Sequence, residues 1–353
     1  MLRILYPINL DHWKFPVATS LRELTLRNSH IDCYSFSSPA SEEDKTFGQQ
    51  LWQRPNIHKI SALDLPLKQF DIVHHASATP RNLTAANLAK LRSLGRCIHL
   101  FTAPIQPHKE DSYYKQYVTS VYKADVLAAV SHAVADDIKA QFDRKVDAVI
   151  PSGVDLDFFS PEKASTLDLV KFNIQRPYVL FVSVLTQRKR PDIFIQIAAK
   201  LPEFNFVMVG GQYTTEEYNK FAKAAYEFPN IKLMGVCPRT KVRDLMAGAL
   251  ALIFPSELEG LPLTILEATS MGLPVLAQPK SSMPEAVIDD LTGWLLPAEN
   301  LNVWADKLKE INQWSTVIRH NFSQRAREFT QKNFSWDLIA KQYSDLYEAV
   351  ARK

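Results

Sequence analysis

Short apolar runs alternate with amphipathic stretches along the chain. Apolar runs bounded by turn residues are typical of strands buried in a parallel sheet, and apolar residues three and four apart are typical of helices. The runs predict strands at residues 2–6, 32–36, 70–75, 96–101, 126–130, 178–184, 204–209, 231–236, 249–254 and 292–297. The periodic stretches predict helices near residues 18–28, 113–122, 131–138 and 262–272, with further helices starting near 191, 244 and 335. This alternation favours two doubly wound α/β domains.

The length of 353 residues exceeds that of one typical domain. A polar, poorly periodic stretch predicts the division of the chain: an N-terminal domain at 1–160, a linker at 161–176, a C-terminal domain at 177–333 and a terminal helix at 334–353. An apolar stripe along that last helix consists of Trp336, Ile339, Tyr343, Leu346 and Val350. The stripe predicts that one side of the helix is buried.

Composition and charge exclude a few classes of protein. The hydrophobic fraction of 46% and the charged fraction of 22% indicate a globular protein, and a net charge of +3 is too small to indicate a nucleic-acid partner. The three cysteines are scattered, and the first stretch is too short for a signal peptide. The few, scattered cysteines favour a reduced, cytoplasmic setting, and no apolar run approaches the roughly 20 residues of a membrane span.

The strongest candidate site follows the predicted strand at residues 249–254. After a short acidic loop a helix begins at Pro262 or Leu263, where free N–H groups favour a phosphate. Glu259 lies just before this helix, and Glu267 lies inside it. Because a carboxylate accepts hydrogen bonds from vicinal hydroxyls such as those of a ribose, the pair predicts a sugar-nucleotide site. Two solvated glutamates at an ordinary helix start fit the spacing equally well.

Two segments resemble those of one enzyme family. Residues 255–275 read PSELEGLPLTILEATSMGLPV, which is similar to the E-x7-E segment of the retaining GT-B glycosyltransferases of family 4 (glycosyl transferases group 1). Residues 149–159, VIPSGVDLDFF, are similar to the interdomain segment of that family, with Ser152 in place of its usual asparagine. The resemblance implies a GT-B fold: two Rossmann-like domains facing a central cleft, with a C-terminal helix crossing back onto the first domain.

The resemblance also implies roles for individual residues. Glu259 would contact the donor sugar, and Glu267 would contact the ribose of a UDP- or GDP-sugar, the donor that stands in place of a bound cofactor. Lys189 fits the family's phosphate-binding lysine, and Arg188 substitutes for an arginine that the family usually has at the position of Val184. Further donor contacts are expected at Ser183, Gly210, Gly211, Val236, Gly260, Leu261, Leu263 and Thr264.

The first domain departs from the family pattern in two loops. Paired glycines are usual after the first strand, whereas residues 11–14 read DHWK, a loop that could contact an acceptor or pack on the surface. A histidine that aids the transfer is usual just past the strand at 96–101, where this chain has Thr102. His99 is the nearby candidate, although strand alternation places it opposite Thr102, and a buried histidine is the more usual state there. His74 is expected to be structural.

The predicted activity is metal-independent, retaining transfer of a sugar from a nucleotide-diphosphate sugar to a hydroxyl of a glycan, lipid or small molecule. The family implies front-side attack, and the nine dispersed histidines lack the spacing of metal ligands. A sugar-nucleotide epimerase and a non-catalytic partner subunit remain alternatives, whereas the lack of G-x-G-x-x-G after a strand argues against an oxidoreductase. Lys14, Arg22 and Arg27 are compatible with a membrane-bound acceptor and equally with a solvated surface.

Overall fold

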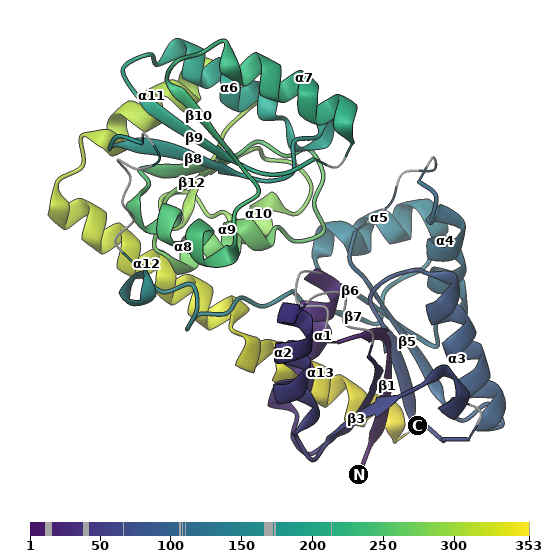
Figure 1. The fold of residues 1–353 in the computed structure, drawn as a ribbon. Coiled ribbons are helices and arrows are strands. Elements are labelled where there is room, and N and C mark those ends of the chain that lie inside the picture. The colour runs from purple at the N-terminus through teal and green to yellow at the C-terminus, as the bar shows by residue number, and fades with distance from the viewer. Residues whose placement is uncertain are drawn as a thin grey trace. The chain divides into compact units, whose positions relative to one another are not determined.

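The computed structural model describes residues 1–10, 16–37, 42–65, 67–105, 107, 109, 111–165, 172, 174–212 and 214–352. The loop at 11–14 and most of residues 166–173 in the expected linker lie outside this set. The chain forms two compact units, one of Met1–Gly153 with Trp336–Lys353 and one of Val154–Ser335. Each unit contains its own parallel sheet with helices on both faces (Figure 1). The predicted α/β class with two doubly wound domains is confirmed.

The N-terminal unit contains a seven-stranded sheet in the order β3-β2-β1-β4-β5-β6-β7. Its strands are β1 (Arg3–Asn9), β2 (Asp32–Phe36), β3 (Ile57–Ile60), β4 (Ile72–His75), β5 (Ile98–Ala103), β6 (Val126–Ala129) and β7 (Ala148–Val149). Its helices are α1 (Pro16–Arg27), α2 (Glu42–Trp52), α3 (Pro80–Arg92), α4 (Tyr114–Lys123), α5 (His132–Phe142) and α13 (Trp336–Ala351). The apolar stripe of α13 is buried in one core with α1 and β1, which explains why the last helix belongs to this unit.

The C-terminal unit contains a six-stranded sheet in the order β10-β9-β8-β11-β12-β13. Its strands are β8 (Tyr178–Val182), β9 (Asn205–Val209), β10 (Ile231–Gly235), β11 (Ala251–Phe254), β12 (Val275–Ala277) and β13 (Gly293–Leu295). Its helices are α6 (Pro191–Lys200), α7 (Thr215–Tyr226), α8 (Arg239–Gly248), α9 (Leu263–Ser270), α10 (Met283–Ala286), α11 (Leu301–Asn312) and α12 (Thr316–Phe334). Helices α6, α7 and α11 cover one face of this sheet, and α8 and α9 cover the other (Figure 1).

Several element boundaries differ from the sequence prediction, and two of the differences have a clear physical reason. Strand β1 was predicted to end at Tyr6, but it continues to Asn9 through an irregular pairing with β2 that accommodates Pro7. Helix α8 was predicted to start near residue 244, but it begins at Arg239 after an extended Pro238. The first turn of α8 is polar and therefore lacks the apolar periodicity on which the prediction depended.

Candidate functional site

The candidate site lies at the carboxyl ends of the strands of the C-terminal unit. The order of its strands reverses between β8 and β11, which are neighbours in the sheet. Open α/β sheets bind ligands at such a switch point. The basic turn at residues 188–190 follows β8, and the acidic loop at residues 257–260 follows β11, so the sheet brings these two segments to the same point.

Lys189 and Glu259 form a buried ion pair at this switch point. Lys189 Nζ contacts Glu259 Oε1, and the two side chains are only 12% and 10% exposed. Ser256 Oγ donates to the same oxygen at 2.6 Å, and the Phe254 ring centre lies 5.3 Å from the ammonium. Burial lowers the pKa of Lys189 from its ordinary value, the charge of Glu259 opposes this shift, and Arg188 adds to it. Glu259 thus favours the charged form of Lys189 at a site with little water.

Arg188 and Arg190 complete the basic turn in different ways. The Arg188 guanidinium donates to the carbonyl of Leu258 and lies 3.7 Å from Glu259 Oε2. The side chain of Arg188 is 35% exposed, so it is the more accessible of the two predicted phosphate-binding groups. Arg190 is instead ion-paired with Asp192 at 2.8 Å and with Glu257 at 2.9 Å. The pair with Glu257 connects Arg190 to the loop that follows β11.

Two serines that were not among the predicted site residues hold Glu259 in place. Ser281 Oγ accepts the Glu259 N–H at 3.2 Å and donates to the Glu259 carbonyl at 2.7 Å. Ser282 Oγ donates to the same carbonyl at 3.1 Å. Both serines follow β12, a three-residue strand that was not predicted. The signal available was their place in a polar loop after the apolar residues 275–277.

Gly210 and Gly211 follow β9 at points where a side chain would not fit. A Cβ atom on Gly210 would lie 1.7 Å from the carbonyl oxygen of Ser183, and one on Gly211 would lie 2.6 Å from Val236 Cγ2. The glycines therefore let the ends of β8, β9 and β10 approach one another. Val236 itself is 81% exposed. The structure thus brings these four predicted residues together, while their contact with a donor stays a prediction.

Helix α9 begins at Leu263, with Pro262 as its N-cap residue. The sequence prediction of a helix start at one of these two residues is confirmed. The N–H groups of Leu263 and Thr264 have no acceptor within the helix, as in any first turn. Both residues are half-buried, and the preceding Gly260 and Leu261 are buried. The positive end of the helix dipole is therefore directed at the loop before α9, which contains Glu259.

Glu267 lies inside α9 and is paired with a residue that the sequence analysis did not single out. Arg239 Nη2 lies 3.2 Å from Glu267 Oε1, and the Glu267 side chain keeps 18% of its surface exposed. Burial raises the pKa of Glu267 to about 7, Arg239 opposes this shift, and the charge of Asp155 adds to it. The exposed part of the carboxylate can still accept hydrogen bonds. An arginine at a polar helix start gives no sequence signal, because such residues are ordinarily solvated.

In the N-terminal unit, His99 is a buried residue with 4% of its surface exposed. Its Nε2 atom lies 2.7 Å from Nε2 of His75. On the other side of the sheet, Thr102 Oγ1 lies 2.8 Å from His74 Nε2 and 3.1 Å from the Tyr343 hydroxyl. His99 and Thr102 thus face opposite sides, as strand alternation predicts, and His99 has the buried state expected of a histidine inside a strand. Its catalytic role stays a prediction.

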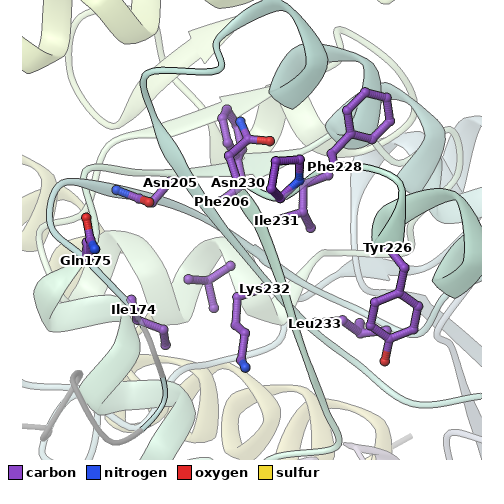
Figure 2. A pocket seen from close by; sticks show the side chains of 12 residues that line it. Ile174, Gln175, Asn205, Phe206, Tyr226, Phe228, Asn230, Ile231, Lys232 and Leu233 are labelled. Atoms are coloured by element: carbon purple, nitrogen blue, oxygen red, sulfur yellow. The ribbon is translucent and has the colours of Figure 1, made fainter.

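A pocket of about 370 Å³ lies elsewhere in the C-terminal unit, beside the first residues of β9 and β10. Asn205, Tyr226, Asn230 and Lys232 are among the side chains around it (Figure 2). The pocket is at the amino ends of these strands, whereas Lys189 follows the carboxyl end of β8. The pocket contains none of the predicted site residues. In the described ranges, no three His, Cys, Asp or Glu side chains are grouped to hold a metal ion. No described helix is long and apolar enough to cross a bilayer.

The two doubly wound parallel sheets, with the last helix of the chain packed in the first unit, match solved structures of the GT-B class. Residues 168–329, within the C-terminal unit, match the family model Glycosyl transferases group 1. The architecture is that of the GT-B class, and the family match over residues 168–329 supports a glycosyltransferase enzyme.

Two sequence relatives agree with this class. The chain is 25% identical over 287 residues to a putative colanic acid biosynthesis glycosyltransferase of Escherichia coli K12, an alignment covering 77% of this chain and 69% of that protein. It is 31% identical over 199 residues to a D-inositol 3-phosphate glycosyltransferase of Mycolicibacterium paratuberculosis. That second alignment covers 55% of this chain and 45% of the relative, so the chain spans under half the length of the inositol enzyme.

Solved structures agree with the fold over nearly the whole chain. A glycosyltransferase from Rickettsia africae aligns with a TM-score of 0.77 at 19% identity, covering 99% of this chain and 98% of that one. Anabaena HepE, solved in complex with UDP and glucose, aligns with a TM-score of 0.78 at 16% identity, covering 99% and 100%. At these identities the likeness concerns the fold alone.

Proposed function

We propose that this chain is a retaining glycosyltransferase that moves a sugar from a UDP- or GDP-sugar to an acceptor hydroxyl. The observation that carries the proposal is the ion pair of Lys189 and Glu259 at the start of α9, the helix that also contains Glu267. The site thus offers a carboxylate for a sugar, positive charge for a diphosphate and a second carboxylate for a ribose. A sugar, a diphosphate and a ribose follow one another in that order in a sugar nucleotide.

In this proposal the diphosphate binds at Arg188, Lys189 and the first turn of α9. Arginine offers a phosphate two parallel hydrogen bonds, lysine offers a point charge, and a helix start offers free N–H groups. Negative charge develops on the diphosphate as the bond to the sugar breaks, so fixed donors there would lower the barrier. The binding of UDP and glucose by Anabaena HepE, which shares the fold, is compatible with such a donor.

The proposed reaction needs no nucleophile from the protein. The acceptor oxygen attacks the anomeric carbon from the side of the leaving diphosphate, whose phosphate oxygen takes the acceptor's proton. The new bond therefore keeps the configuration of the old one. Glu259, held by Ser256 and Ser281, would orient the sugar hydroxyls, and orientation is the main contribution of such a site. We assign the acceptor, a hydroxyl of a glycan, lipid or small molecule, to the N-terminal unit of a cytoplasmic enzyme; a lipid acceptor would bring the enzyme to a membrane surface.

Thermal unfolding against a panel of UDP-, GDP-, ADP- and CMP-sugars tests the donor. A ligand at about 100 times its dissociation constant adds about 2.7 kcal/mol to the free energy of unfolding. We expect stabilisation by one nucleotide class, lost in Glu267→Ala and kept in Glu203→Ala, an exposed glutamate before β9. NMR of the product would then show the donor's anomeric configuration. Stabilisation by no member of the panel would contradict the proposal.

A further inference from the structure

Arg239 is held between the carboxylate of Glu267 and two aromatic rings. It is the first residue of α8, and its Nη2 atom lies 3.2 Å from Glu267 Oε1. Its guanidinium carbon lies 5.1 Å from the ring centre of Phe158 and 5.1 Å from that of Phe159. An arginine over aromatic faces gains a cation–π attraction, and the carboxylate adds a charged hydrogen bond. The guanidinium therefore has a defined place, although its side chain is 38% exposed.

The turn that contains Phe158 and Phe159 is hydrogen-bonded to α9, the helix that contains Glu267. Phe159 is fully buried, and its carbonyl accepts a hydrogen bond from Ser270 Oγ of α9 at 2.6 Å. Its N–H donates to the carbonyl of Asp155 at 2.8 Å, and the N–H of Phe158 donates to Asp155 Oδ1 at 2.9 Å. This tight turn contains the second half of the segment VIPSGVDLDFF. The turn thus supports the arginine that lies against Glu267.

The charges around Glu267 make Arg239 the group that favours its ionised form. Burial disfavours the charge of Glu267, and Asp155 adds repulsion. On the α12 side of α9, the nearby cation is Arg327, which donates to the Ser270 carbonyl at 3.0 Å, at the end of the helix. Arg239 contacts Oε1 only, so Oε2 and the exposed edge of the carboxylate are left for a ligand.

We propose that Arg239 is a positioning residue for the donor ribose: it favours the ionised form of Glu267 and orients the carboxylate so that it accepts both vicinal hydroxyls. This inference rests on the proposed function, because it assigns Glu267 to the ribose. A protonated carboxyl would offer one fewer acceptor and would place a hydrogen where a ribose hydroxyl must donate. Nucleotide affinity should therefore depend on Arg239 most strongly at low and neutral pH.

Calorimetric titration of UDP and GDP between about pH 5.5 and 9 tests this role. In Arg239→Ala we expect the midpoint of the pH dependence of affinity to rise by about one unit or more, which is about a tenfold loss of affinity below both midpoints. Affinity should partly return at high pH, and Arg239→Lys should restore the midpoint. The matched control is Arg243→Ala, since Arg243 lies 5.0 Å from the Phe158 ring but is paired with Asp244 at 2.8 Å.

An unchanged midpoint in Arg239→Ala, or equal losses in Arg239→Ala and Arg243→Ala, would overturn the positioning role and leave the proposed function standing. Binding of neither UDP nor GDP by the unaltered protein at any pH would overturn both. If the alanine variant does not fold, Arg239→Gln removes the charge while keeping most of the side chain, and the same shift is expected. A Gln variant with the normal midpoint would contradict the proposal.

Discussion

Lys189 and Glu259 are 70 residues apart in the chain, and their side chains form an ion pair that is 12% and 10% exposed. Bringing two charges out of water has a large cost, which their mutual attraction offsets only when the remaining hydrogen bonds are satisfied. Ser256 provides one of those bonds to Glu259 at 2.6 Å. A buried pair of this kind, at the switch point of a ligand-binding sheet, is weak evidence for stability and better evidence for a site.

Glu259→Gln should therefore lower the free energy of unfolding of the C-terminal unit by about 3 kcal/mol, because Lys189 stays buried without its counter-charge. Urea denaturation measures this loss. The double variant Lys189→Met with Glu259→Gln should recover part of it, since no charge then remains buried. Glu257→Gln is the control: that side chain is 41% exposed, and its loss should cost less than about 1 kcal/mol. Equal losses in the single and double variants would contradict this explanation.

The two glycines after β9 should respond differently to the same substitution. In Gly210→Ala the new Cβ meets the backbone carbonyl of Ser183 at 1.7 Å, and backbone there cannot move without disturbing β8. We expect a loss of about 3 kcal/mol in the free energy of unfolding. In Gly211→Ala it meets only the Val236 side chain, which is 81% exposed and can turn away, so the loss should stay below about 1 kcal/mol. Denaturation curves of both variants decide the matter; similar losses would mean that the contact with Val236 is equally rigid.

The fold could be predicted from the sequence to the extent that its elements are long and apolar. Strands such as β8 and β11 are buried on both faces, so their residues form continuous apolar runs. Strand β7 has only two residues and β3 has an exposed lysine, so neither shows a clear pattern, and the three-residue β12 was also not predicted. Helix α9 was predicted because Pro262 directly before it and Gly272 shortly after it mark its start and its end.

Direct contacts between site residues could be predicted only where the residues are close in the sequence. Glu259 and Glu267 belong to one motif, whereas Ser281 bonds to Glu259 across 22 positions and Arg239 to Glu267 across 28. Such contacts depend on which strands are neighbours, and that order follows from the crossover connections rather than from any local pattern. The sequence placed each motif at the end of a strand; the sheet determined which motifs meet.

Glu267 should make stability fall as the pH rises. Its pKa is about 7 in the folded protein against an ordinary 4.5, so between these values the folded state holds a proton that the unfolded state has lost. Stability must then decrease from about pH 4.5 to about pH 7 and level off above. Glu267→Gln lacks this dependence, and its free energy of unfolding should gain up to about 3 kcal/mol on the unaltered protein over that range. Urea denaturation at several pH values measures the difference; parallel curves would place the pKa of Glu267 near its ordinary value.

The N-terminal unit contains a buried chain of hydrogen bonds that links its sheet to α13. His74 Nδ1 lies 2.7 Å from the Tyr347 hydroxyl, which lies 3.1 Å from the Tyr6 hydroxyl. Burial lowers the pKa of His74 well below its ordinary value and raises that of Tyr347 well above its own, so both groups are neutral at pH 7. The contribution of these hydrogen bonds to stability is therefore independent of charge.

Tyr347→Phe should destabilise the N-terminal unit by about 1–3 kcal/mol, because it leaves a ring nitrogen of His74 and the hydroxyl of Tyr6 buried without their partner. The phenyl ring keeps the packing in the core, so the loss reports on hydrogen bonding rather than on a cavity. Tyr122→Phe is the matched control: its hydroxyl donates to the Phe142 carbonyl at 3.2 Å, but the residue is 57% exposed. Water can replace that bond, and denaturation should show a loss below about 1 kcal/mol. Equal losses in the two variants would mean that the buried groups find other partners once Tyr347 has lost its hydroxyl.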